Sequence, residues 1–121
     1  MGRIISIHEY ELREGTTLQM LIEAFRQAEA AGLFRLPGLE RYSLLVGLKG
    51  ARSGRAAAVW VYPSRQAWEA LWGPPDRPFG PEAYPPNWRV WEEDFLAPLL
   101  QGDPDRILYT AYEEVAGQGA E

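Results

Sequence analysis

The chain has 121 residues, a net charge of -5, no cysteine and a single histidine. The lack of cysteine excludes disulfides, thiolate metal sites, iron–sulfur clusters and a cysteine nucleophile, and one histidine excludes a site that needs two imidazoles from one chain. The acidic balance argues against nucleic-acid partners and against docking on anionic membranes. The length indicates one domain, which we place at residues 1–115, followed by a frayed tail at 116–121.

The N-terminus turns acidic after a short apolar run, so we expect no secretion signal there, and no stretch approaches the length of a membrane span. A cytoplasmic protein is the simplest interpretation. Ten prolines and a single asparagine fit a protein from a thermophile, although a GC-rich genome gives the same bias.

The chain begins with loosely alternating residues, which predict a strand over 3–12. Residues 16–31 predict an amphipathic helix, in which Thr16 and Gln19 have the spacing of a capping box and Gly32 is placed to end the helix. Its apolar side consists of Leu18, Leu21, Ile22, Phe25 and Ala28.

Residues 41–49 and 55–62 predict two strands of a hairpin, joined by the short, glycine-bounded connector 50–54. Both strands are apolar on both faces. In the second strand one face carries Trp60 and Tyr62 with two alanines, and we assign this face to the interior of a barrel. A strand without a polar face must be covered on both sides.

Residues 65–72 predict a short helix with Ser64 as its cap. The following segment, 74–87, holds six prolines and cannot form a regular element. It is too apolar for a solvated linker, because Phe79 and Tyr84 need somewhere to pack, so we expect a packed surface loop.

Asn87 is placed to cap a third helix over 88–100, which Pro98 should kink or end early. Residues 106–115 predict the last strand. The resulting order is strand, helix, strand, strand, helix, strand, which is the split βαβ or ferredoxin-like pattern of an α+β protein.

This fold places its helices on one face of a four-stranded antiparallel sheet and leaves the other face open. The sequence does not make the open face polar, and such a patch exceeds what soluble monomers usually expose. A second copy packed face to face would cover it. We therefore predict a homodimer whose two sheets enclose a shared, aromatic-lined interior. Which faces of 42–49 and 106–115 line that interior stays open.

Four segments resemble the dimeric α+β barrel superfamily, and within it the antibiotic-biosynthesis-monooxygenase-like group: PGLERYSLLVGLKG (37–50), AVWVYPSRQAWEALWG (58–73), YPPNWRVWEEDFLAPLL (84–100) and ILYTAYEEV (107–115). The resemblance covers about residues 3–115 in pattern and element order and contains no catalytic signature. It implies dimerisation and a place among cofactor-free quinol-type monooxygenases, haem-degrading enzymes, isomerases and members without assigned activity. The haem-degrading members use a helix histidine as iron ligand, and no predicted helix here contains one.

His8 and Tyr10 are the candidate catalytic residues. On an alternating strand they share a face with Ser6, and if this face looks into the barrel, His8 could act as a general base or bind a phenolic substrate. The alternative is a histidine near a strand end that is bonded to a backbone carbonyl or solvated.

Trp60, Tyr62, Asn87 and Trp88 are the candidate substrate-binding residues. Trp60 lies in mid-strand, where a pocket and a core position are equally compatible with the pattern. Asn87 and Trp88 stand at a helix N-terminus, which can bind an anion, although a plain cap explains Asn87 as well. Helical spacing is typical of core residues, and it applies to four tryptophans: Trp68, Trp72, Trp88 and Trp91.

We interpret the remaining clusters of charged residues as solvent-exposed surface. The acids at 92–94 point in different directions on a helix and indicate a solvated face rather than a metal site. Lys49, Arg52 and Arg55 gather at the hairpin, where bases protect an exposed sheet edge from pairing. We expect no metal and no cofactor.

Three functions remain open from the sequence. The first is a cofactor-free monooxygenase or isomerase that acts on a small aromatic compound in a dry cavity. The second is a dimer that binds a small ligand without chemistry. The third is a structural dimer whose barrel is filled by its own side chains.

Overall fold

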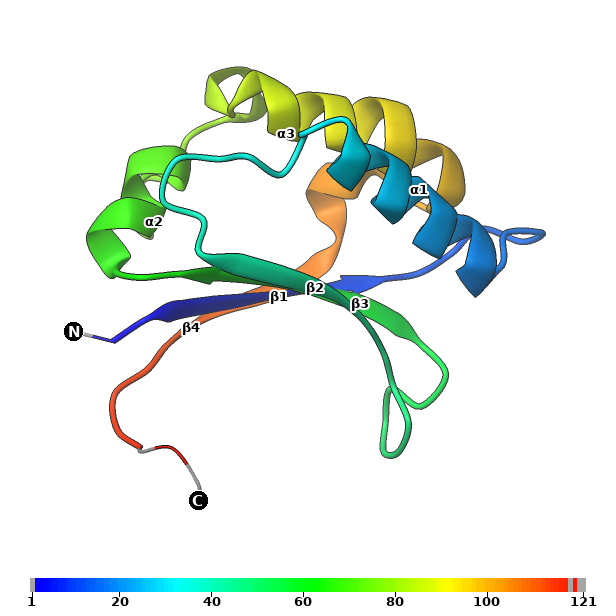
Figure 1. Ribbon diagram of the computed structural model, residues 1–121, viewed down its shortest axis with the longest axis horizontal. Helices are drawn as coiled ribbons and strands as arrows, with labels where there is room; N and C mark the ends of the chain where they lie inside the picture. Colours follow the sequence, from blue (N-terminus) through cyan, green and yellow to red (C-terminus); the bar gives the residue numbers. More distant parts are fainter. Residues whose placement is uncertain (1, 118, 120–121) are drawn as a thin grey trace.

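The computed structural model describes residues 2–117 and residue 119. A four-stranded sheet with the order β2-β3-β1-β4 and only antiparallel neighbours forms one layer (Figure 1). The predicted strands are present, each shorter than expected by one to four residues, as β1 (Ile4–Tyr10), β2 (Arg41–Val46), β3 (Ala56–Tyr62) and β4 (Leu108–Glu113). Of the predicted tail 116–121, residues 118, 120 and 121 lie outside the described residues.

All helices cover the same face of this sheet (Figure 1). They are α1 (Leu18–Ala30), α2 (Arg65–Trp72) and α3 (Pro86–Val90), the last continued by a π-helical turn (Trp91–Leu96) and a 3-10 turn (Ala97–Leu99). Further 3-10 turns lie at Pro81–Ala83 and Pro104–Arg106. This is the ferredoxin-like α+β fold predicted from the order of elements. No helix in the described part of the chain is long and apolar enough to cross a membrane.

Hydroxyl side chains cap the N-terminal ends of α1 and α2. Thr17, not the predicted Thr16, caps α1, and its side chain accepts a hydrogen bond from the Met20 N–H at 3.2 Å. The capping-box prediction was therefore wrong by one residue, because two adjacent threonines offer the same chemistry. Ser64 caps α2 as predicted, and its hydroxyl accepts from the Ala67 N–H at 3.1 Å.

The third helix begins earlier than predicted. Pro85 is its N-terminal flanking residue, so Asn87 lies inside the first turn and is not the cap. The proline-rich segment is also more regular than expected, since it contains the turn at Pro81–Ala83. Pro98 does not kink an α-helix but lies in a 3-10 turn, after a π-helical turn in which the Ala97 N–H bonds to the Glu92 carbonyl. Single π-helical turns of this kind often mark functional sites.

The register decides which residues face the helices. Trp60 pairs with Ser6 and Tyr42, and His8 pairs with Ala58 and Tyr109. The barrel assignment was wrong: His8, Tyr10, Trp60 and Tyr62 lie on the helix-covered face. Alternation separates the two faces of a strand, but it cannot tell which face the helices cover when both are apolar.

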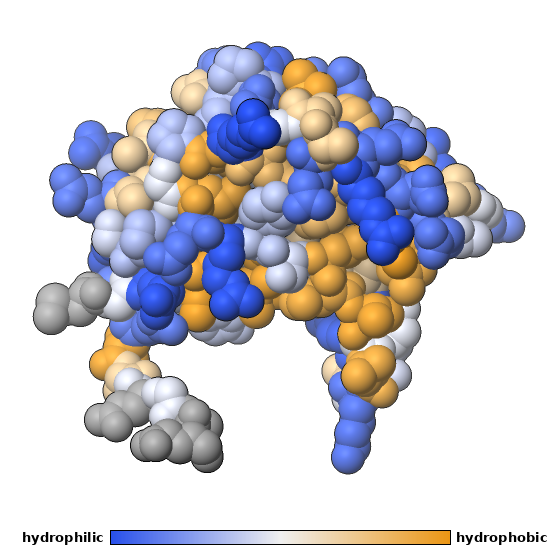
Figure 2. Space-filling model, viewed as in Figure 1, coloured by the Kyte–Doolittle hydropathy of each residue, from blue (hydrophilic) through white to orange (hydrophobic). Residues whose placement is uncertain are grey.

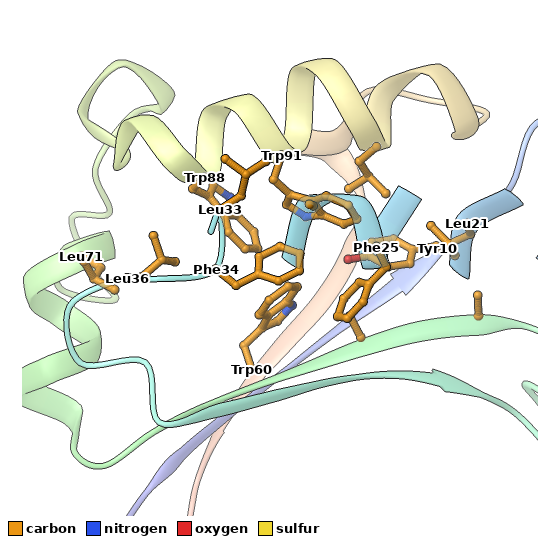
Figure 3. Packing of buried hydrophobic residues seen from close by; sticks show 14 of the residues in the cluster. Tyr10, Leu21, Phe25, Leu33, Phe34, Leu36, Trp60, Leu71, Trp88 and Trp91 are labelled. Atoms are coloured by element: carbon orange, nitrogen blue, oxygen red, sulfur yellow. The ribbon is translucent and has the colours of Figure 1, made fainter. Parts of the chain in front are cut away.

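Large aromatic rings fill the space between the sheet and the helices (Figure 3). Trp60 is 1% exposed, and its ring centroid lies 5.2 Å from that of Phe34 and 4.8 Å from that of Trp88. Trp91 is fully buried against Phe34 and Phe25. The thick core therefore takes the bulky side chains of β3, while the smaller Ala57, Val59 and Val61 face the other way.

The face away from the helices is uncovered and mainly apolar. From β4 it exposes Leu108 and Tyr112, which are 58% and 56% exposed. From the other strands it presents Ile5, Ile7, Leu45, Val59 and Val61. The connector between β2 and β3 projects to this side, where the molecule is hollowed (Figures 1 and 2). The prediction of an open apolar face is confirmed.

Candidate functional site

A pocket of about 450 Å³ lies on the helix side of the sheet, at the edge formed by β1 and β4. This volume falls within the range of about 300–1,000 Å³ that is usual for small-molecule sites. The helix α2, the proline-rich loop, α3 and the turn Pro104–Arg106 complete its walls. Eight aromatic rings line it: His8, Tyr62, Trp68, Trp72, Phe79, Tyr84, Trp88 and Tyr109.

Five of these rings form a continuous chain in which neighbours stand nearly perpendicular. The Trp72 ring lies 5.3 Å from Tyr84 and 5.4 Å from Trp88, at interplanar angles of 78° and 69°. His8 lies 5.9 Å from Trp88 and 5.7 Å from Tyr109, at 80° and 70°. Edge-to-face contacts of this kind are favourable and fix the rings in place. Neighbouring rings of the pocket wall therefore hold one another in nearly perpendicular orientations.

His8 stands on the floor of the pocket, in the middle of β1. Its ring contacts Trp60, Trp88 and Tyr109, and no residue in the described chain forms a hydrogen bond with it. Burial lowers the pKa of His8 to about 4, because a charged imidazole is poorly solvated among these rings. At neutral pH His8 is therefore uncharged, with one ring nitrogen that can accept a proton and one that can donate.

Carboxylates form one end of the pocket. Burial, together with the negative charge of Asp105, raises the pKa of Glu92 to about 7. The Trp88 side chain, one helical turn earlier, hydrogen-bonds to Glu92 and opposes this rise. The pKa of Asp105 is raised too, by burial and by the nearby Asp103 and Glu93. Glu92 thus changes protonation near neutral pH, where a proton acceptor works best.

The opposite end of the pocket carries Arg65 and Glu113. Arg65 forms an ion pair with Glu69 at 2.7 Å, and the charge of Glu113 adds to the rise in the pKa of Arg65. On β4, Tyr109 lies beside His8, whereas Glu113 lies beside Ile4, four residues further along the strand. At about 3.3 Å per residue this separation is about 13 Å. Arg65, the one cation among the described residues that line the pocket, thus lies with Glu69 and Glu113 rather than with Glu92 and Asp105.

Three of the six predicted site residues line this pocket: His8, Tyr62 and Trp88. The Tyr62 hydroxyl accepts a hydrogen bond from the Trp72 indole N–H at 3.1 Å. Burial raises the pKa of Tyr62, so its phenol stays protonated. These three residues come from β1, β3 and α3, and the fold brings them together although they are far apart in the sequence.

The other three predicted site residues, Tyr10, Trp60 and Asn87, do not line the pocket. Tyr10 is 3% exposed, and its hydroxyl has no hydrogen-bond partner among the described residues. Burial, and to a smaller extent the charge of Glu92, raises the pKa of Tyr10. Trp60 lies beneath His8 in the core, and its indole N–H is likewise unpartnered within the described chain.

Asn87 connects α3 to the segment that follows α1. Its amide nitrogen lies 3.5 Å from the carbonyl oxygens of Gly32 and Arg35. Its side chain thus has a structural place in the loop packing. The plain structural role that the sequence offered as the alternative for Asn87 is consistent with these contacts.

The sequence reasoning missed Glu92, which was interpreted as solvated, and it treated Trp68 and Trp72 as core residues. One signal was available. Trp88 and Glu92 are four residues apart, so on a helix they share a face, and that face carries an inward tryptophan. Glu93 follows the prediction, since it is exposed and pairs with Arg89 at 3.2 Å.

A second hollow of about 610 Å³ lies at the other end of the sheet, beside the hairpin connector. Its rim contains Arg52 and Arg55. Arg52 forms an ion pair with Glu9, and Arg55 lies 3.5 Å from Glu11. These arginines are thus balanced by the acids of the neighbouring strand. In the described part of the chain no group of three metal-ligating side chains is close enough to hold a metal ion.

No protein-family description and no curated protein matches this chain. Solved structures do match over nearly the whole chain. SnoaB, a cofactor-independent oxygenase from Streptomyces nogalater, is 14% identical, with 98% of this chain and 97% of that chain covered and a TM-score of 0.59. A dimeric ferredoxin-like protein of unknown function from Thermobifida fusca is 18% identical, with 93% and 92% covered and a TM-score of 0.57.

A third structure, from Bordetella bronchiseptica, is described as a candidate antibiotic biosynthesis monooxygenase. It is 11% identical, with 96% of this chain and 100% of that chain covered and a TM-score of 0.63. At such identities the likeness concerns the fold alone. Fold and pocket define a ferredoxin-like α+β protein with an aromatic site between its sheet and its helices. The resemblance to antibiotic-biosynthesis-monooxygenase-like structures, predicted from the sequence, is confirmed at the level of the fold.

Proposed function

We propose that this protein is a homodimer whose subunits each bind a small aromatic compound in the pocket between the sheet and the helices. The observation that carries the proposal is the pocket itself, in which rigid aromatic walls surround a few polar groups, His8 and Glu92 among them. Flat apolar ligands gain most from such walls, and the few polar groups set their orientation. The site differs from the interior between two sheets that the sequence suggested.

The reaction we propose is a cofactor-free oxygenation of a phenolic compound. His8 or Glu92 takes the phenol proton, and the electron-rich phenolate reacts with dioxygen. One oxygen atom enters the ring, the other leaves as water, and the substrate becomes a quinone and supplies all the electrons. The similarity in fold to SnoaB, described as a cofactor-independent oxygenase, supports this choice. The alternative is a binding protein that performs no chemistry.

Ligand binding can be tested by titrating the protein with 1-naphthol and following tryptophan fluorescence, because Trp68, Trp72 and Trp88 line the pocket. Tyr84→Leu removes one wall and should weaken binding about tenfold, since a stacked ring contributes about 1 kcal/mol or more. Tyr42→Leu removes a ring outside the pocket and serves as the control. Equal binding by Tyr84→Leu and the unchanged protein would contradict the proposed site.

Catalysis is separated from binding by oxygen uptake with a panel of quinols and naphthols. In the enzymatic case the variant that lacks the proton acceptor, His8→Ala or Glu92→Gln, lowers turnover about a hundredfold while naphthol affinity changes little. If the protein only binds its ligand, the unchanged protein and the variant would both bind naphthol, and neither would consume oxygen with any compound. The absence of oxygen uptake over the whole panel would therefore refute the oxygenase proposal and favour the alternative.

The dimer rests on the uncovered face of the sheet, and the Thermobifida fusca protein of similar fold is described as dimeric. Val59 lies in the centre of this face, paired with Ile7 and Ser43. Val59→Glu places a charge there and should give monomers in sedimentation experiments, because burying an unpaired carboxylate is costly. Val59→Thr is the matched control and should remain dimeric. A monomeric unchanged protein at micromolar concentration would refute the proposed assembly.

A further inference from the structure

We propose that the pocket prefers a positively charged ligand, an ammonium group carried on an apolar or aromatic body. The ammonium would lie against Trp72, Tyr84 and Trp88, beside Glu92 and Asp105. This inference rests on the proposed function, since it names the chemical class that the same pocket takes.

The first argument is the electrostatic character of the ring faces. The face of an aromatic ring is negative, so a cation within about 6 Å of several faces is attracted to all of them. The Trp72 ring lies 5.3 Å from Tyr84 and 5.4 Å from Trp88, at interplanar angles of 78° and 69°, and all three rings line the pocket. Several aromatic rings that line one pocket are a surface with which proteins hold quaternary ammonium groups.

The second argument is the charge balance at this end of the pocket. Glu92 and Asp105 both line it, and no arginine, lysine or histidine among the described residues forms an ion pair with either. The nearest acid neighbours add to the repulsion, with Asp103 in the same turn and Glu93 on the same helix. Partly buried carboxylates without a counter-ion are unfavourable, and a cation would offset that repulsion.

The third argument concerns the cations that the protein could supply itself. Arg65 lies at the opposite end of the pocket and is already paired with Glu69. His8 is uncharged at neutral pH, because its pKa is about 4. Neither side chain forms an ion pair with Glu92, so a cationic ligand would be the counter-ion of its ionised carboxylate.

A neutral or an anionic aromatic ligand fits this end less well. A neutral ring would gain the stacking contacts but would leave both carboxylates uncompensated. A carboxylate beside Glu92 and Asp105 would add a third like charge. The order of affinity expected from the pocket is therefore cation, then neutral compound, then anion.

Three compounds of similar size test this order. Phenyltrimethylammonium and tert-butylbenzene have nearly the same shape and differ in charge, and benzoate carries the opposite charge. Titrations followed by tryptophan fluorescence should give an affinity for the cation at least about tenfold higher than for tert-butylbenzene, with benzoate weakest. Glu92→Gln keeps the side-chain shape and should lower the affinity for the cation about tenfold while changing that for tert-butylbenzene less than about twofold.

Glu93→Gln is the matched control. Glu93 is the next residue on the same helix, its side chain is 62% exposed, and it does not line the pocket. Because its charge lies outside the pocket and is screened by solvent, this variant should change the affinity for the cation less than about twofold. Asp105→Asn provides a second pocket variant should Glu92→Gln fail to fold. Equal affinities for the cation and tert-butylbenzene would overturn the charge preference and leave the aromatic site intact. Failure of all three compounds and of 1-naphthol to bind would overturn both proposals together.

Discussion

Replacing Glu92 by glutamine should make the unliganded protein more stable at neutral pH. The pKa of this carboxyl is raised from 4.5 to about 7 in the folded protein, chiefly by burial and then by Asp105. Between these pH values the unfolded chain loses the proton while the folded protein keeps it. Stability therefore falls as the pH rises through this window, and the whole penalty is present above about pH 7.

The size of the effect follows from the same pKa change. At 1.36 kcal/mol per pH unit, a rise from 4.5 to about 7 sets a ceiling of about 3 kcal/mol. Glu92 keeps some contact with solvent, which screens its charge, so we expect about 1–2 kcal/mol. Glutamine carries no charge, and its carbonyl oxygen can still accept the hydrogen bond of the Trp88 side chain.

Urea unfolding of Glu92→Gln and of the unchanged protein, at about pH 8 and at about pH 4.5, measures this difference. At the higher pH the variant should have the larger free energy of unfolding, and at the lower pH the two proteins should agree within about 0.5 kcal/mol. Glu93→Gln, at the exposed neighbouring position, should show no such pH-dependent gain. A variant that is less stable at the higher pH, or that differs equally at both, would refute the assignment of Glu92 to a buried acidic wall.

Three further predictions test the parts that hold the pocket together. His8, the single histidine, should show one imidazole titration by NMR with a pKa of about 4, and a value near 6.5 would mean that its ring is solvated. Ser64→Ala should lower the free energy of unfolding by about 1 kcal/mol in urea, whereas Ser64→Asp should not. Gly73→Ala should lower the free energy of unfolding by about 1–3 kcal/mol. Gly73 has a φ of 87°, and an added Cβ would lie 2.7 Å from the Phe79 backbone nitrogen. An unchanged midpoint of urea unfolding would show that the proline-rich loop does not pack against Gly73.

Much of the fold could be predicted from local pattern. The helix at 65–72 was found at its observed bounds, because Ser64 and Gly73 give unambiguous start and stop signals. The third helix was misjudged, because three features overlap there: the Pro85 and Pro86 pair, the π-helical turn and the prolyl 3-10 turn. Such turns have no sequence signal as simple as a cap.

The site was predicted only in part, because its formation depends on which face of the sheet the helices cover. His8 on β1 and Trp60 on β3 lie on the same face of the sheet. The alternation of apolar residues predicts this shared face, but it does not predict what covers the face. Glu92 was missed for a related reason. A helix that carries acids at three consecutive positions appears solvated as a whole, yet each position points in a different direction.

The two faces of the sheet differ in the size of the side chains that they carry. The helix side of β3 carries Trp60 and Tyr62, whose rings fill a deep layer and bring Trp88 against His8. The other side carries Ala57, Val59 and Val61, whose short side chains contribute to the apolar surface that sheet-on-sheet packing requires. An exchange of these two sets would leave the alternation intact and remove the pocket. The size of the residues on each face, in addition to their hydropathy, therefore separates the side of this sheet that carries the thick core and the pocket from the side that carries the open apolar surface.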